Sequence, residues 1–361
     1  MGNELLNQKK IKFGVFEAAL ATLLFVIFNV VFIEGYRTII INYGVSSLGI
    51  LVAQFLVEAL FGLAAVVVAY FCRNNIIKAA GLDKKISVYT IIYAILIALC
   101  SLVFFARLTA SFLELLSLIG YKSSSSAMDV DTFGKYIGYV IAACVTPAVC
   151  EELLFRGVIQ SGLKKYGKWI SIISASLIFM LMHGGPEQTV HQFIVGIIVG
   201  LIFYETGNLW LSVMVHFFNN FLSITELFIY NIMLKPASDV AIEGSAEVVE
   251  LTTTEAWASF SINFTIALVM AIVGFFAVSG LIKMMIKENK LITENENKIK
   301  ENQTIIIDGV EESLVQNQNE SNVMAEEDKK RMDTKTIVCF TIAIAWLVFE
   351  WGMAFLGGFM I

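Results

Sequence analysis

The sequence predicts an all-α, polytopic integral membrane protein with a core of eight membrane-spanning helices and one additional C-terminal span. Of the 361 residues, 57% are hydrophobic and only 16% are charged, whereas soluble domains are nearer a quarter charged. The chain also contains repeated apolar runs of about 20 residues, the length that crosses a bilayer. The net charge of −6 and the lack of a dense basic block argue against a nucleic-acid partner.

The apolar runs give nine candidate spans, of which the fifth and sixth are short. They cover residues 13–34, 45–72, 88–119, 135–163, 169–183, 190–206, 209–234, 257–286 and 336–359. Lys and Arg gather before the first span and after the second, fourth and eighth. The positive-inside rule therefore places the N-terminus in the cytoplasm. The first run is too long for the apolar region of a signal peptide, so we expect it to be retained as a span.

Composition divides the chain into three parts. Residues 1–286 would form the membrane core, which holds all the motifs described below. Residues 287–335 are rich in Asn, Glu and Lys and contain no aromatic residue. Such a segment buries little apolar surface, so we expect a disordered cytoplasmic linker. Residues 336–361 would form the extra transmembrane span.

Two adjacent carboxylates, Glu151 and Glu152, interrupt an apolar region and are followed by Arg156. A charged side chain at the bilayer centre costs roughly 2.5–3.5 kcal/mol on insertion scales. These residues therefore form either a structural ion cluster or the chemical centre of the protein. The spacing of Glu152 and Arg156 favours a salt bridge on one helix face. Pro147 in the same run is expected to kink the helix and free backbone groups near the carboxylates.

All three histidines lie between positions 183 and 216. His216 and Asn220 are four residues apart and share one helix face. If the fourth and fifth spans form a hairpin, Glu151 and His183 lie roughly 20 and 22 Å from its tip, at about 1.5 Å per residue. His216 lies roughly 10 Å deep in the seventh span, a gap that helix tilt can close. The sequence thus predicts one intramembrane cluster of these four residues with Glu152.

Such a cluster is suited to the activation of water. A carboxylate beside a histidine can act as a general base, and a histidine with an Asn amide can stabilise an oxyanion. Two histidines and a carboxylate can instead ligate zinc and leave a position open for water. The residue pattern leaves both a zinc site at Glu151, His183 and His216 and a metal-free glutamate mechanism open.

The motifs Glu-Glu-x-x-x-Arg at 151–156, Phe-x-x-x-His at 179–183 and His-x-x-x-Asn at 216–220 resemble the CAAX prenyl protease and bacteriocin-processing (CPBP) family of intramembrane peptidases. The resemblance covers about residues 135–225. It implies hydrolysis of a peptide bond in a membrane-presented peptide or a protein C-terminus, prenylated in some settings, with the lipid bilayer as the surroundings.

The same resemblance implies a role for each motif residue. Glu151 would activate the hydrolytic water together with His183. His216 and Asn220 would stabilise the oxyanion, or His216 would help to bind a metal. Glu152 and Arg156 would brace the site, and Phe179 would pack beside it.

Several neighbouring residues have a simpler explanation. His191 follows a polar turn and is expected to be a capping or interfacial residue. Helical spacing from His216 favours Asn220 over Asn219 as the functional amide. Cys150 is expected to be an inert buried thiol. The intramembrane Arg107 is expected to pair with one of two acidic residues, Glu58 or Glu114.

Two other functions remain as alternatives. An ion-coupled transporter would use the intramembrane charges Glu17, Glu58, Arg107 and Glu151 as relay groups, but it predicts broken helices in both halves, and Pro147 has no counterpart. A bacteriocin self-immunity or binding protein would keep the fold without catalysis. The Asn-, Lys-, Ile- and Glu-rich linker resembles the coding bias of AT-rich bacteria, which favours a bacterial plasma membrane.

Overall fold

The structure, a computed structural model, describes residues 12–43, 47–123, 128, 130–234, 252–311 and 332–360. All of its regular elements are helices, and eight of these described helices are long and apolar enough to cross a membrane. The prediction of an all-α polytopic membrane protein is therefore confirmed. The predicted fifth span is a shorter apolar helix of 14 residues, α8 (Lys168–Leu181).

Along the chain, two sets of helices precede α8. The first comprises α1 (Val15–Tyr43), α2 (Ser47–Phe71), the short α3 (Ile76–Ala80) and α4 (Val88–Leu118). The second is one nearly continuous helix made of α5 (Phe133–Tyr139), η2 (Val140–Val145), α6 (Thr146–Glu152), η3 (Leu153–Gln160), α7 (Ser161–Leu163) and η4 (Lys164–Tyr166). After α8 come η5 (Pro186–Gln188), α9 (Thr189–Thr206), α10 (Leu209–Ile229), η6 (Tyr230–Leu234), α12 (Thr253–Glu311) and α13 (Thr334–Gly357).

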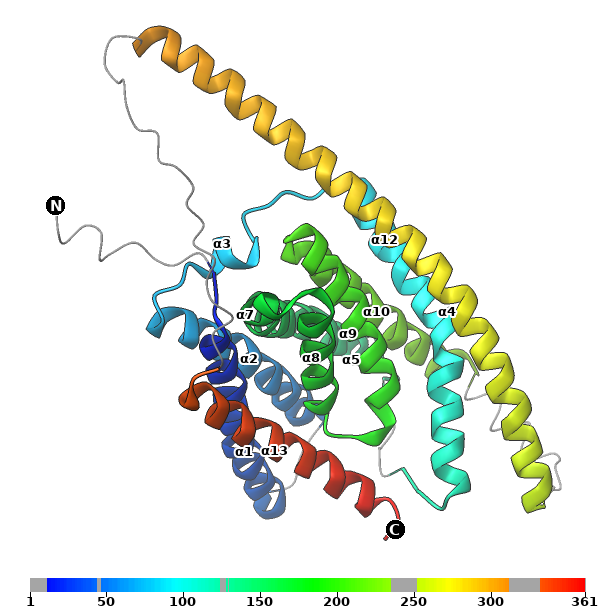
Figure 1. Ribbon diagram of the computed structural model, residues 1–361. Coiled ribbons are helices and arrows are strands. Elements are labelled where there is room, and N and C mark those ends of the chain that lie inside the picture. Colours follow the sequence, from blue (N-terminus) through cyan, green and yellow to red (C-terminus); the bar gives the residue numbers. More distant parts are fainter. Residues whose placement is uncertain are drawn as a thin grey trace.

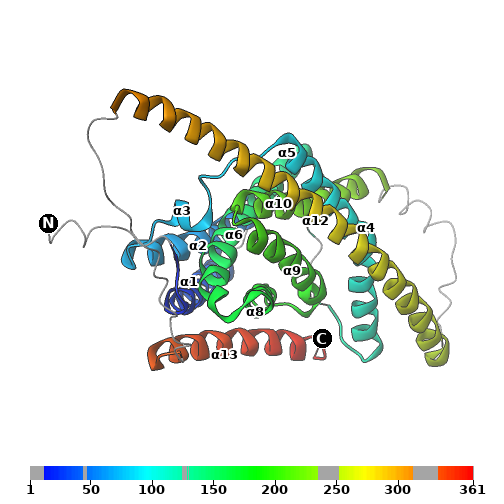
Figure 2. The same ribbon diagram turned by 45° about the horizontal axis from the view of Figure 1, so that its top comes forward.

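The helices are arranged in three groups (Figures 1 and 2). The middle group contains α8, α9 and α10 together with the segment from α5 to α7. The pair α4 and α12 lies on one side of it, and α1 and α2 lie on the other, with α13 packed along α1 and α8. Many large apolar side chains on the outer helix faces are exposed. Such a surface suits contact with lipid rather than with water.

The longest helix, α12, corrects one prediction. It has 59 residues and continues through the segment 287–311, where we expected a disordered linker. The helix runs along α4 and projects beyond the other helices at its C-terminal end (Figure 1). Extending an existing helix adds one hydrogen bond for each residue fixed, and Lys and Glu are good helix formers. Residues 312–331, the rest of the predicted linker, lie outside the described residues.

The helix that carries the adjacent carboxylates is not a regular α-helix. Two π-helical segments, η2 and η3, flank the short α6, so the carboxylates lie at the junction of α6 with η3. A π-helical turn is rare and often occurs at functional sites, because it shifts the direction of the side chains that follow. Pro147 lies at the start of α6, where the prediction placed a disruption of the helix.

A row of aromatic rings connects α1 to the middle group. The ring centroids of Phe25 and Phe61 lie 4.0 Å apart, and those of Phe61 and Phe155 lie 5.8 Å apart. Phe155 meets Phe179 edge to face at 4.9 Å. Aromatic pairs with such separations contribute beyond the burial of their area. The row therefore fixes α8 against α1, α2 and η3.

Small residues allow the closest helix contact in this part of the fold. A Cβ atom at Gly162 in α7 would lie 2.8 Å from the Cβ of Ala18 and in conflict with the Gly14 carbonyl oxygen. Glycine is therefore required here by the approach of α1 to α7. Small residues at helix interfaces allow this kind of approach in membranes.

We predict that Gly162→Ala lowers the free energy of unfolding by about 1–3 kcal/mol, the usual cost of overpacking. The measurement is thermal or denaturant unfolding of the purified protein in detergent. The matched control is Gly280→Ala in α12, where a Cβ would meet nothing within 4 Å. Alanine should be neutral or slightly stabilising there, because it orders the helix at less entropic cost than glycine. Equal effects of the two substitutions would contradict the prediction.

Candidate active site

Glu152 lies at the centre of a fully buried ion network. Its Oε1 atom accepts hydrogen bonds from Arg156 Nη1 at 2.9 Å and from His216 Nδ1 at 2.8 Å. Arg156 is 1% exposed and Glu152 is 0% exposed, and the predicted salt bridge between them is confirmed. Moving charged groups out of water costs free energy, so buried ions need oppositely charged partners at hydrogen-bonding distance. The network joins η3 to α10.

Arg156 also attaches this network to α8 and α9. Its Nη2 atom donates to the carbonyl oxygen of Gly196 at 3.2 Å. One turn further, Gln160 Nε2 donates to the Gly200 carbonyl oxygen at 2.7 Å. The guanidinium carbon lies 4.6 Å from the centroid of the Phe179 ring, a distance that suits a cation–π contact. Arg156 and Phe179 therefore hold three helices in register around Glu152.

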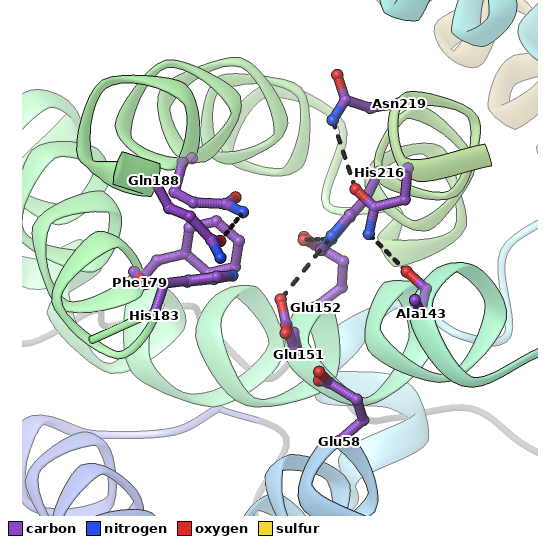
Figure 3. Close-up of polar contacts among 12 residues, drawn as sticks. Glu58, Ala143, Glu151, Glu152, Phe179, His183, Gln188, His216 and Asn219 are labelled. Atoms are coloured by element: carbon purple, nitrogen blue, oxygen red, sulfur yellow. Dashed lines mark hydrogen bonds and ion pairs between the residues drawn. The ribbon is translucent and has the colours of Figure 1, made fainter. Parts of the chain in front are cut away.

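The hydrogen bond to Glu152 orients His216. Because a carboxylate only accepts hydrogen bonds, His216 Nδ1 carries a proton, and the other ring nitrogen is directed toward Glu151. His216 Nε2 lies 3.8 Å from Glu151 Oε2 (Figure 3). This separation is longer than a hydrogen bond. Within the described chain, Glu151 Oε2 is buried without a hydrogen-bond partner.

His183 is oriented in the same way from the other side of the site. It lies just after α8, and its Nδ1 atom lies 2.8 Å from the carbonyl oxygen of Phe179. A carbonyl oxygen can only accept, so Nδ1 carries the proton and Nε2 is left with a lone pair in the neutral ring. The Phe179 ring contacts both histidines, with centroid separations of 4.8 Å to His183 and 5.9 Å to His216. Figure 3 shows the His183 ring directed toward the space beside Glu151.

Asn220 compensates for Pro147. Proline has no N–H to donate to the carbonyl four residues earlier, which belongs to Ala143. Asn220 Nδ2 donates to that carbonyl at 3.0 Å. The amide nitrogen of Asn has two hydrogens, so the second one remains for another acceptor. Asn220, which helical spacing places on the same face as His216, therefore also compensates for the helix disruption expected at Pro147.

These groups surround one cavity of about 490 Å³. Its lining includes the predicted residues Glu151, His183, His216 and Asn220. Other lining residues come from α2, α4, η5 and α9: Gln54, Glu58, Leu102, Ala106, Thr109, Glu187, Gln188 and His191. The volume is within the range of small-molecule and peptide sites. The predicted cluster is therefore assembled, with Glu152 behind it rather than on its surface.

The structure corrects the interpretation of two residues outside the motifs. His191 lines the cavity rather than merely capping a turn, and its Nε2 atom lies 3.0 Å from Asn219 Nδ2. Asn219 is 3% exposed, so both neighbouring amides are engaged near the site. Sequence spacing identified only Asn220, because Asn219 contacts a residue of another helix.

Glu58 is the main site residue that sequence reasoning misplaced. Its carboxyl group is directed toward Glu151 (Figure 3), and it accepts a hydrogen bond from Gln54 at 2.6 Å. We expected Arg107 to pair with Glu58 or Glu114, but within the described helices neither pair forms. Glu114 instead contacts Asn263 of α12. Charge alone suggested these pairs, and only helix packing shows which residues meet.

The side chains do not provide a ready zinc site. Among the described residues, no group of three or more His, Cys, Asp or Glu side chains is arranged so that it could hold a metal ion. Zinc requires about four ligands at roughly 2.0–2.3 Å, and the described side chains do not form such a set. Zinc at Glu151, His183 and His216 therefore stays a prediction.

A buried carboxylate and two oriented histidines line a cavity between membrane helices, an arrangement that can support hydrolysis. In a comparison with protein families, residues 133–222 match the family described as type II CAAX prenyl endopeptidase Rce1-like. This segment is an Rce1-like domain, and that family comprises intramembrane proteases. Comparisons with curated proteins and with solved structures gave no match.

We predict that Arg156→Met lowers the free energy of unfolding by about 3–5 kcal/mol, because it leaves the Glu152 charge buried and unpaired. The measurement is denaturant unfolding in detergent, with amide exchange of α9 as a local readout.

The matched control for this change is Lys168→Met. Lys168 at the start of α8 pairs with Glu205 near the end of α9, and both side chains are 35% exposed. Breaking this pair should cost only about 0–1 kcal/mol. A similar loss in both variants would mean that the buried network is not a special source of stability.

Proposed function

We propose that the protein is an intramembrane endopeptidase in which Glu151 activates water together with His183, while His216 and Asn220 stabilise the oxyanion. The observation that carries the proposal is the buried Glu151 Oε2 atom. It lies on the cavity without a hydrogen-bond partner among the described residues, opposite the free nitrogens of two oriented histidines. A buried unpaired acceptor is costly unless it has a use.

Water activation follows from the acceptors at the cavity. A water molecule between Glu151 and His183 would donate one hydrogen to the carboxylate and the other to His183 Nε2. This arrangement points an oxygen lone pair at a carbonyl carbon placed in the cavity. As the oxygen attacks, its proton passes to Glu151, which is the role of a general base.

The oxyanion would be stabilised from the opposite side. Asn220 offers its second amide hydrogen, and His216 donates from Nε2 when its ring carries both protons. The Glu152 carboxylate accepts the hydrogen bond from Nδ1, and Arg156 holds Glu152 in place. Donors that are fixed before the reaction stabilise a developing charge without a reorganisation cost.

Collapse of the tetrahedral intermediate completes the reaction. The proton held by Glu151 passes to the nitrogen of the scissile bond, and the C–N bond breaks. The products are a new carboxylic acid, which keeps the second hydrogen of the water, and a new amine, so that one water is consumed and the carboxylate of Glu151 is restored.

We infer a peptide or protein substrate that reaches the cavity from the membrane. The buried position of the site between membrane helices supports a membrane-presented peptide or a protein C-terminus, prenylated or not. The distribution of Lys and Arg supports a cytoplasmic N-terminus. The composition of the region after residue 287 favours a bacterial plasma membrane.

We expect Glu151→Gln to lower cleavage by about 10²–10⁴-fold, the usual contribution of a general base, while the protein still folds. The measurement compares the termini of peptides and membrane proteins from native-host cells that carry wild-type protein or the variant at matched expression. The control is Glu114→Gln, which changes a half-buried carboxylate that contacts Asn263 outside the site. Termini that persist in the Glu151 variant would remove this residue from the mechanism.

The two neighbouring amides allow a second, sharper comparison. Asn220→Ala should lower kcat by about 10²–10³-fold, the effect of losing one oxyanion donor. Asn219→Ala removes the contact with His191 but no donor to the oxyanion, so its effect should stay below about tenfold. Both are measured with a substrate identified by the terminus comparison. A reversed order of the two effects would assign the oxyanion role to Asn219.

A further inference from the structure

The C-terminal helix α13 lies outside the segment that matches the family, yet it contacts the turn that follows His183. Trp351 Nε1 donates a hydrogen bond to Thr189 Oγ1 at 2.9 Å. Thr189 Oγ1 lies 3.5 Å from the carbonyl oxygen of Gly185, to which it donates. The contact therefore continues from α13 to a backbone position two residues after His183.

A second contact reaches the same turn through the end of α4. Tyr121 is 6% exposed, and its hydroxyl donates to Glu187 Oε1 at 2.7 Å. Burial, together with the Glu187 carboxylate, raises the pKa of Tyr121 to about 12, so the hydroxyl remains a donor at physiological pH.

The end of α13 holds Tyr121 in place. The Tyr121 ring contacts those of Phe355 and Phe359, with centroid separations of 6.0 and 5.8 Å. The Lys122 backbone N–H donates to the Gly358 carbonyl oxygen at 2.8 Å. Glu187 is thus fixed by α13 through Tyr121.

The turn between α8 and α9 is held partly by its own backbone. Gly184 N–H donates to the Leu181 carbonyl oxygen at 3.1 Å, and Gln188 N–H donates to the Gly185 carbonyl oxygen at 3.2 Å. Gly184 has a φ of 67°, a left-handed conformation that glycine adopts without strain. His183, Glu187 and Gln188 all line the cavity, so contacts that hold the turn from outside add to the hydrogen bond with Phe179 in positioning His183.

We propose that α13 is a strap that holds the turn at residues 183–189 against the cavity, with Trp351 and Tyr121 as positioning residues for His183. Neither residue touches the cavity: none of the described lining residues belongs to α13. The strap therefore supports the site and does not block it. Its effect on catalysis rests on the proposed function of His183, whereas its effect on the turn does not.

The test uses Trp351→Phe and Tyr121→Phe, which keep the aromatic rings but remove the two hydrogen bonds to the turn. Hydrogen exchange of the full-length protein in detergent or nanodiscs should be faster for the amides of residues 183–189. kcat should fall about three- to tenfold for each variant, the effect of one neutral hydrogen bond, with little change in KM. Rings that remain packed keep the protein folded, so the thermal midpoint serves as a check.

Matched controls are Trp346→Phe and Tyr89→Phe. Trp346 lies on α13 but is 37% exposed and lines an outer groove with α1, and Tyr89 is 62% exposed. Both should leave exchange of the turn and kcat unchanged. A shift of the thermal midpoint without faster exchange in the turn would show a purely structural role and overturn the proposal.

The remaining outcomes test the strap formed by α13 and the proposed proteolytic function separately. Unchanged exchange in the Trp351 and Tyr121 variants, or a rise in kcat, would overturn the strap. Faster exchange with unchanged kcat would overturn the positioning of His183. If the wild-type protein cleaves nothing, the proposed function fails, and exchange alone decides whether α13 holds the turn.

Discussion

The site depends on the buried ion network of Glu152, Arg156 and His216. Glu152 Oε1 accepts hydrogen bonds from both partners, and Arg156 continues to the backbone of α9. A carboxylate, a guanidinium and an imidazole buried in the protein interior are tolerable only when they pair with each other. The requirement for pairing fixes three helices relative to each other. It also turns the free nitrogen of His216 toward Glu151.

The second constraint is the irregular helix that carries the carboxylates. Two π-helical segments and Pro147 interrupt its regular hydrogen bonding. Asn220 of α10 donates a hydrogen bond to the Ala143 carbonyl, which Pro147 cannot do. A side chain proposed to stabilise an oxyanion therefore also ties the helix to its neighbour. Asn220 thus has a structural role beside its proposed chemical one, because a carbonyl group that lacks its helical donor in a membrane interior must find another donor.

Helices α12 and α13, which follow the matched domain in the chain, pack on two different sides of it. α12 extends the side formed with α4, whereas α13 packs on the opposite side along α1 and α8 (Figures 1 and 2). Of these two helices, α13 contacts the turn that bears His183 and Glu187. The residues of the proposed site are thus supported from outside by a helix that contributes no group to the cavity among the described residues.

The sequence by itself determined the membrane class, most of the spans and the central residues of the site. Apolar runs report burial in lipid directly, and the four-residue spacing of Glu152 with Arg156 and of His216 with Asn220 is local to one helix. The depth estimate also placed Glu151 and His183 together correctly, since a hairpin fixes the level of both.

Only the tertiary structure decided which residues meet across helices. Glu58 contacts Gln54 and faces Glu151 rather than Arg107, and Asn219 contacts His191. The helical state of residues 287–311 was missed, because composition reports the lack of a core but not the extension of a helix that already exists. Contacts between helices depend on rotation and tilt, which the packing of the whole bundle sets and local spacing does not encode.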